Sequence, residues 1–258
     1  MNDQPPNLPP EIPTIPVPQE APPAPAQPTG RKVRNLIGVC VLVVLLAALA
    51  GVIWFRFILP DQREKEAIAA LKAANVLTIV EDRHARTVNL VGKTLDDDTL
   101  QQVGRLYRLS ALDLYGTNFT GGQLRFIAGL SGLTSLVLTD TKVTDEDLVW
   151  LKGLKQLTAL HIGATQVSDA GLVHLAGLKE LAILDLSKTR VTDAGLKHLL
   201  GLENLRHLLL SDDPITDAGL ETLAELKDLG RLTIVHTKVT PAGVARLKKA
   251  LPRLSVDL

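Results

Sequence analysis

The stretch "LAILDLSKTRVTDAGLKHLLGLEN", residues 181–204, contains a five-residue motif, TDAGL, that occurs elsewhere in the chain. TDAGL stands at 192–196 and at 216–220, and SDAGL stands at 168–172, so successive copies lie 24 residues apart. A motif at constant spacing is the signature of a chain built from repeated structural units. The spacing therefore decides the fold, and it has to be understood before the motif is interpreted as a site.

Units of 24 residues follow one another in phase, beginning at 85, 109, 133, 157, 181, 205 and 229. The first six positions of a unit follow L-x-x-L-x-L, and this alternation predicts a short strand with one buried face. Later in each unit apolar residues recur at intervals of three, as at Leu196, Leu199 and Leu202, which is typical of one face of a short helix. Each unit is thus predicted to form a strand, a turn and a helix.

The pattern L-x-x-L-x-L-x-x-T resembles the leucine-rich repeat, with threonine where the consensus of that family carries Asn or Cys. The second half, V-T-D-A-G-L-x-x-L, is similar to the bacterial 24-residue variety. Over residues 85–258 the resemblance implies an α/β fold, a leucine-rich-repeat solenoid with a curved parallel sheet on its concave side and short helices on its convex side. Lys93 and Asp213, the latter followed by Pro214, replace the threonine, so we expect irregular turns there. The threonines are Thr117, Thr141, Thr165, Thr189 and Thr237.

The motif TDAGL itself is interpreted as a helix start. Its threonine or serine precedes a helical segment, where a side-chain oxygen can accept from an unpaired backbone N–H. Its aspartate lies in the first turn, where negative charge suits the helix dipole, and its glycine leaves room for a neighbouring coil. An anion site at each helix start is the alternative, but an acid occupies the same turn. The residues concerned are Thr144, Ser168, Thr192, Thr216 and Thr240, then Asp145, Asp169, Asp193 and Asp217, and Gly171, Gly195, Gly219 and Gly243, with Pro241 in place of the last aspartate.

Residues 1–30 hold 11 of the 15 prolines and no lysine or arginine, so they are predicted to form a disordered, partly polyproline II tail. The P-x-x-P patterns in this tail fit aromatic-groove domains, although a solvated spacer is favoured at this proline density. An anchor region, 31–60, follows, with twenty uncharged positions at 36–55 that are long enough to cross a bilayer. A cleaved signal peptide is the alternative, because "ALA" at 48–50 resembles a cleavage site.

Charge around the apolar run predicts its orientation. Arg31, Lys32 and Arg34 precede it without a nearby acid, which places the N-terminus in the cytoplasm and the repeats outside, in the periplasm or on the cell surface. We therefore expect a single-pass membrane protein that contacts the membrane through residues 36–59. The lone Cys40 is interpreted as an inert membrane cysteine.

Both ends of the repeat array need a cover. Residues 61–84 are predicted to form an N-terminal cap, with a helix over about 62–74, in which Ile68 and Leu71 face inward, and a strand at 76–80. At the other end Leu254, Val256 and Leu258 predict a strand whose outer edge is open. The basic residues before it are interpreted as protection against aggregation, with homo-oligomer formation through this edge as the alternative.

The variable positions of the strands should line the concave face, where a partner would bind. The candidate residues are Asp113, Tyr115, Val137, His161, Asp185, His207, Leu209, Arg231 and His236. A Ser–His–Asp arrangement of Ser187, His161 and Asp185 is imaginable, but an open strand face without an oxyanion loop disfavours catalysis. His174 and His198 share a convex position without a further ligand at metal-binding spacing. We predict no catalytic, cofactor or metal site.

Composition limits the class of partner that this chain is expected to bind. After position 60 the chain has 24 basic and 25 acidic residues, and such a neutral domain is not expected to bind nucleic acid. The prediction is a non-enzymatic, membrane-anchored recognition or scaffold module that binds a protein or an envelope component through the concave face. The alternative is a structural envelope protein that assembles through its C-terminal edge strand.

Overall fold

The computed structural model describes residues 48–49, 52 and 59–258. The proline-rich tail 1–30, the basic flank and almost all of the predicted span 36–55 lie outside the described residues. Within the described ranges, no helix has both the length and the apolar character needed to cross a bilayer. The chain divides into two units, and the repeats belong to the unit Ile53–Leu258.

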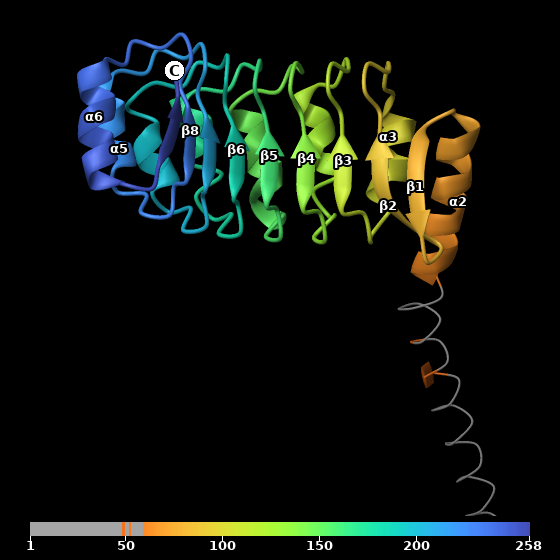
Figure 1. Cartoon of the computed structure of the whole chain (residues 1–258). Coiled ribbons are helices and arrows are strands. Elements are labelled where there is room, and N and C mark those ends of the chain that lie inside the picture. Colours follow the sequence, from red (N-terminus) through yellow and green to blue (C-terminus); the bar gives the residue numbers. More distant parts are fainter. Residues whose placement is uncertain (1–47, 50–51, 53–58) are drawn as a thin grey trace, which may run out of the picture. The chain divides into compact units, whose positions relative to one another are not determined.

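The described residues of this unit form one nine-stranded sheet in which the strands lie side by side in chain order (Figure 1). The first two strands, β1 (Leu77–Glu81) and β2 (His84–Asn89), form an antiparallel hairpin, and every later pair is parallel. The later strands are β3 Ala111–Asp113, β4 Ser135–Val137, β5 Ala159–His161, β6 Ile183–Asp185, β7 His207–Leu209, β8 Arg231–Thr233 and β9 Ser255–Asp257.

A second layer of short helices lies behind the sheet, with α2 at one end of the row and α6 at the other (Figure 1). Most of these helices are one or two turns long, because each repeat has few residues left in which to return to the next strand. The helices are α2 Leu59–Ala73, α3 Asp97–Gly104, η2 Gly121–Phe126, η3 Glu146–Gly153, α4 Asp169–Leu172, η4 Leu196–Leu199, α5 Asp217–Leu223 and α6 Pro241–Ala250, where η denotes a 3₁₀ helix.

Stacked leucines between the two layers form the core. The central leucine of each repeat strand is at most 1% exposed, and each such side chain contributes about 1.5–3 kcal/mol through burial. The leucines in the strand centres are Leu112, Leu136, Leu160, Leu184, Leu208 and Leu232. The predicted alternation is therefore confirmed, although the regular strands are three residues long rather than six.

Backbone pairing continues beyond the strands. The N–H of Leu114 donates to the carbonyl of Val137 at 2.9 Å, and that of Gly116 donates to Thr139 at 3.0 Å. The position of Gly116 adopts a left-handed backbone in every repeat. Glycine occupies this position only at Gly92 and Gly116, and the other residues there are Asp140, Ala164, Lys188, Asp212 and His236, with φ between 52° and 62°.

The N-terminal cap has the predicted helix and strand, as α2 and β1. Leu71 of α2 is 1% exposed and belongs to the core, as expected. Glu64 was not predicted to be part of this core; it is fully buried and accepts the N–H of Ala85 at 3.2 Å. Nδ1 of His84 lies 2.7 Å from the other carboxylate oxygen of Glu64. This buried pair joins the helix of the cap to β2.

The two turns that lack threonine keep the strand register. The pairing of β2 with β3 and that of β7 with β8 are unbroken, so the irregular turns expected at Lys93 and Asp213 do not disturb the sheet. At Lys93 the backbone bond of the turn is the same as in a threonine turn, because the N–H of Lys93 donates to Leu90 as that of Thr117 donates to Leu114.

Candidate binding surface

The TDAGL motif proves to be a connection between repeats. The backbone N–H of Thr192 donates to Oδ1 of Asp169 at 2.7 Å, and the Thr192 hydroxyl donates to Oδ2 at 2.6 Å. The same two bonds join three further pairs, which are Ser168 with Asp145, Thr216 with Asp193, and Thr240 with Asp217. We call this pair of bonds the aspartate clasp.

The glycine of the motif makes room for the clasp. A Cβ built on Gly195 would overlap the carboxylate of Asp169, and Gly171, Gly219 and Gly243 have the same relation to the preceding aspartate. The glycine prediction is therefore confirmed. The aspartate was assigned only a dipole effect, and its principal contact is with the next repeat.

The capping prediction is confirmed for Ser168, Thr216 and Thr240, whose side chains accept from N–H groups in the first helical turn. It is wrong for Thr144, because Asp145 is the N-cap residue of the helix Glu146–Gly153. Thr192 accepts the N–H of Ala194, but Gly195 is the N-cap residue of η4, so the prediction is wrong there as well. The preceding repeat has Gly121 where the clasp aspartate would stand, and Asp147 of the same repeat accepts the N–H of Thr144 at 2.9 Å instead. Carboxylates therefore bind the donors at these helix starts, and the motif builds no anion site.

The outward side chains of the nine strands form a surface that we call the strand face. Register places them in two straight rows, because each residue pairs with its equivalent in the next strand. One row is Leu77, Asn89, Asp113, Val137, His161, Asp185, Leu209, Thr233 and Asp257. The other row is Ile79, Thr87, Ala111, Ser135, Ala159, Ile183, His207, Arg231 and Ser255.

The predicted binding residues follow this geometry. Asp113, Val137, His161, Asp185 and Leu209 share the first row. His207 and Arg231 are neighbours in the second row. Tyr115 and His236 lie just past the ends of β3 and β8, on the turns, and His236 is in the left-handed position.

Several polar side chains of the strand face pair with one another. Nδ1 of His161 lies 3.7 Å from Oδ2 of Asp185, and Nε of Arg231 lies 2.8 Å from Oδ2 of Asp257. Nδ1 of His236 lies 3.1 Å from Oδ1 of Asp212. These side chains therefore already have partners within the chain at the end of the face from β5 to β9.

The carboxylates on the face also serve the backbone. Oδ1 of Asp113 accepts the N–H of Tyr115, and Oδ1 of Asp185 accepts that of Ser187, both at 3.0 Å. Burial alone would raise the pKa of Asp185, but the interactions with His161 and with Ser187 outweigh it and lower the pKa. Asp185 is therefore held as a carboxylate by His161 on the neighbouring strand and by Ser187 in its own turn.

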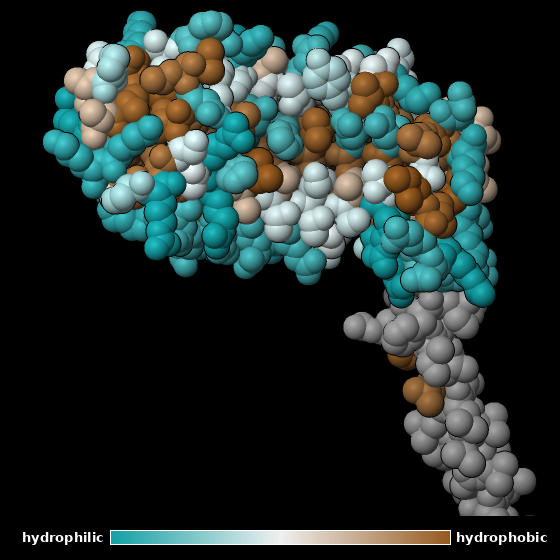
Figure 2. Space-filling model, in the orientation of Figure 1, coloured by the Kyte–Doolittle hydropathy of each residue, from teal (hydrophilic) through white to brown (hydrophobic). Residues whose placement is uncertain are grey.

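The opposite end of the strand face is apolar and exposed. Leu77 is 66% exposed, Ile79 49%, Tyr115 47% and Val91 43%. Figure 2 shows hydrophobic side chains gathered over β1 to β3. Of these residues only Tyr115 was predicted, because Leu77 and Ile79 belong to the hairpin rather than to a repeat.

The histidines form neither a Ser–His–Asp triad nor a metal site in the described part of the chain. His161 lies beside Asp185, but within the described residues no hydrogen bond joins the Ser187 hydroxyl to His161, so the nucleophile and base of a triad are not paired. In the same part of the chain no three His, Cys, Asp or Glu side chains are grouped to hold a metal ion.

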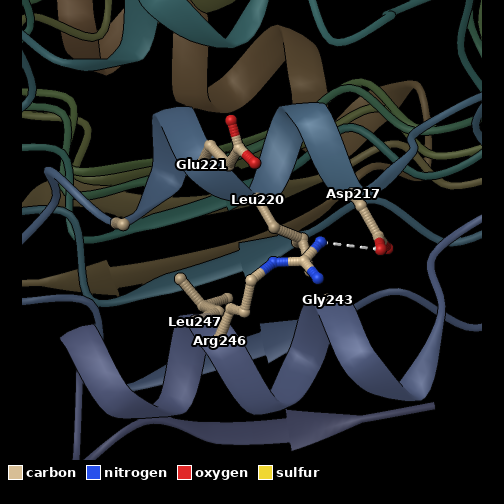
Figure 3. A pocket seen from close by; sticks show the side chains of 7 residues that line it. Asp217, Leu220, Glu221, Gly243, Arg246 and Leu247 are labelled. Atoms are coloured by element: carbon tan, nitrogen blue, oxygen red, sulfur yellow. Dashed lines mark hydrogen bonds and ion pairs between the residues drawn. The ribbon is translucent and has the colours of Figure 1, made fainter.

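A pocket of about 230 Å³ opens on the helix side, between α5 and α6 (Figure 3). Arg246 reaches from α6 to Asp217 on α5, where Nη2 lies 3.0 Å from Oδ2. Hydrogen bonds from the backbone and side chain of Thr240 lower the pKa of Asp217, and Arg246 lowers it further. Asp217 thus serves both the last aspartate clasp and this ion pair. The lining residues are Asp217, Leu220, Glu221, Ala224, Gly243, Arg246 and Leu247.

Comparison with solved structures supports the fold. An internalin, inlF, from Listeria monocytogenes matches with a TM-score of 0.57 at 24% identity, over 67% of this chain and 47% of that chain. Internalin C2 from the same species matches with a TM-score of 0.52 at 24% identity, over 66% of this chain and 80% of that chain. This chain thus spans about half the length of the first internalin.

No protein-family model matches the sequence, and neither does any curated protein. The structural matches and the sheet topology together confirm the predicted fold, whereas the bacterial subtype of the repeat and the membrane anchor stay predictions. The repeat-bearing unit is a leucine-rich-repeat solenoid, a parallel sheet of repeat strands covered on one side by short helices.

Proposed function

We propose that this chain is a membrane-anchored module that binds a protein partner through its strand face. The exposed apolar group Leu77, Ile79, Val91 and Tyr115 carries this proposal. Soluble proteins rarely expose contiguous apolar side chains without a use for them, and buried aromatic and aliphatic anchors supply most of the affinity of an interface. A solenoid scaffold of this kind generally presents a binding surface.

The two ends of the strand face have different roles in this proposal. The apolar end, over β1 to β3, supplies affinity by excluding water. The charged end, which includes His207 and Arg231, orients the partner, because exposed ion pairs contribute little net energy but respond to an approaching charge. The absence of an assembled nucleophile and base on the described part of this face favours a binding role over an enzymatic one.

Membrane anchoring rests on the sequence. The uncharged run 36–55 is long enough to span a bilayer, and Arg31, Lys32 and Arg34 favour a cytoplasmic N-terminus. The repeats would then face the periplasm or the cell surface. Cysteine labelling of the full chain in intact cells tests this: a cysteine at exposed Glu66 should react with an impermeant reagent and one at position 20 should not. The reverse pattern contradicts the orientation.

A variant pair tests the binding surface. Ile79→Ser with Tyr115→Ala removes apolar side chains from the strand face, whereas Val149→Ser with Trp150→Ala removes similarly exposed side chains from the helix side. Capture by the full chain after cross-linking in its native membrane is compared by quantitative mass spectrometry. We expect the strand-face variant to weaken capture about tenfold or more and the helix-side variant to leave it unchanged. Equal capture by the two variants contradicts the proposal.

A further inference from the structure

Asp213 occupies a position that a threonine fills in four other repeats whose side-chain bonding is uniform. In those repeats the threonine hydroxyl donates to the carbonyl three residues earlier. The pairs are Thr117 with Leu114 at 2.9 Å, Thr141 with Leu138 at 2.6 Å, Thr165 with Ile162 at 2.7 Å, and Thr237 with Ile234 at 2.8 Å. In these four turns the side chain is an O–H donor, whereas the hydroxyl of the fifth threonine, Thr189, donates to Asp213. An ionised carboxylate has no proton to donate, whereas a neutral carboxyl group has one.

The surroundings of Asp213 are those of a neutral acid. The residue is only 2% exposed. Both neighbouring donors go to one oxygen, since Oδ1 accepts the backbone N–H of Thr189 at 2.7 Å and its hydroxyl at 3.2 Å. The other oxygen, Oδ2, is buried without a hydrogen-bond partner. A charge on that oxygen would be uncompensated, and such burial is costly.

Neighbouring charges do not neutralise it. Asp185 on β6 and Asp212 in the same turn are both acidic and disfavour a further negative charge. The cationic groups on the adjacent turns, Lys188 and Arg190 before it and Lys238 after it, are exposed, and His236 pairs with Asp212. Burial is the largest cause and raises the pKa of Asp213 to about 7, against the hydrogen bonds from Thr189, which lower it.

We propose that Asp213 is a proton-sensitive element of the solenoid, protonated in the stable turn and destabilising that turn when it ionises near neutral pH. Protonation removes the charge from Oδ2, the buried oxygen that accepts no hydrogen bond. Ionisation puts an uncompensated charge behind the turn that links β7 to α5 and carries Asp212, the partner of His236 on the strand face. The pH response would therefore be delivered to the charged end of the binding surface.

The sign of the effect follows from linkage. The native state holds a proton that the unfolded chain releases near its ordinary value, 3.8, and the native state releases it near 7. Stability is therefore greatest below the unfolded-state pKa and falls as pH rises through that window. A variant with threonine at this position has no such group, so it should lose less stability between about pH 5 and about pH 8.

Thermal unfolding of the purified full chain tests this. The wild type, Asp213→Thr and the control Asp228→Asn, at an exposed acid on the helix side, are each melted at about pH 5 and about pH 8. We expect the melting temperature of the wild type and of Asp228→Asn to fall between the two conditions by several degrees more than that of Asp213→Thr. Equal falls in the wild type and in Asp213→Thr overturn the proposal.

A second measurement does not depend on the variant folding. Hydrogen exchange of the wild-type chain reports on the amide of Ile215, whose N–H donates to the carbonyl of Asp213 at 2.8 Å. After correction for the intrinsic pH dependence of exchange, protection of this amide should fall as pH rises through neutrality. The amide of Thr158, which donates to Thr134 at 2.8 Å in a distant turn, should keep its protection. Parallel behaviour of the two amides contradicts a local role for Asp213.

Discussion

Asp169 of one repeat accepts both the backbone N–H and the hydroxyl of Thr192 in the next repeat, at 2.7 and 2.6 Å. This contact joins neighbouring coils beyond the ends of the strands, where each coil turns towards the helix side. It explains why threonine, aspartate and glycine recur together, since the aspartate of one unit occupies the space left by the glycine of the next. TDAGL is thus a joint between units as well as a helix start.

Removal of a clasp aspartate should destabilise the solenoid. Asp193→Ala leaves the N–H and hydroxyl of Thr216 without their acceptor, and we expect a loss of about 1–3 kcal/mol in the free energy of unfolding. Chemical denaturation measures it. Asp228→Ala, at an exposed acid in the same half of the solenoid, is the control and should change stability by less than about 0.5 kcal/mol. A similar loss in both variants would show that the clasp contributes nothing specific.

The glycine and the aspartate should be energetically coupled. A Cβ at Gly219 would overlap the carboxylate of Asp193, so Gly219→Ala should cost about 1–3 kcal/mol through overpacking. In the double variant Asp193→Ala with Gly219→Ala that overlap is absent, and the total loss should be smaller than the sum of the single losses. Gly129→Ala, where a Cβ meets nothing within 4 Å, is the matched control. Additive single losses would refute the steric relation.

The buried acid in the cap, Glu64, should contribute more to the free energy of unfolding than its exposed neighbour Glu66. Glu64→Ala removes the acceptor of the Ala85 N–H and the partner of His84, and buried partners left unpaired cost about 3 kcal/mol. Glu66→Ala, in the same helix and exposed, should be near neutral. Denaturant midpoints compare the two. Equal midpoints would mean that the cap does not depend on this pair.

Glycine should be favourable at the left-handed position. Ala164 has φ of 52°, a left-handed backbone that costs an L-residue about 1–2 kcal/mol and that glycine adopts without this strain. Glycine also has more conformational entropy in the unfolded chain, which offsets about half of the gain in stability. Ala164→Gly should therefore stabilise the chain by about 0.5–1 kcal/mol. Ala159→Gly, within β5, should destabilise it. Loss of stability in both variants would show that the backbone at 164 is not strained.

The period of 24 residues was sufficient to predict the leucine core and the parallel sheet, because these features repeat from unit to unit, whereas the helix start follows the motif only at Ser168, Thr216 and Thr240. The left-handed position was not predictable, since only Gly92 and Gly116 show its usual residue. The clasp was missed because its two residues lie 23 positions apart and meet only when coils stack.

The position of the candidate site on the strand face was predicted from the sequence, but the exposed apolar residues at its N-terminal end were not. Charged residues such as Asp185 and Arg231 were predicted to bind a partner, but the strand register pairs them with His161 and Asp257. The exposed apolar residues Leu77 and Ile79 stand in the antiparallel hairpin, outside the repeat pattern that was used to find the face. A surface property that depends on how strands are paired cannot be deduced from composition.

Site-specific photo-cross-linking tests the central claim most directly. A photoreactive amino acid is placed in the full chain at Ile79 on the strand face, and in a second variant at Trp150 on the helix side, both exposed in the structure. We predict that irradiation in the native membrane yields a discrete cross-linked partner from position 79 and none from position 150. A partner captured from position 150 but not from position 79 would contradict binding through the strand face.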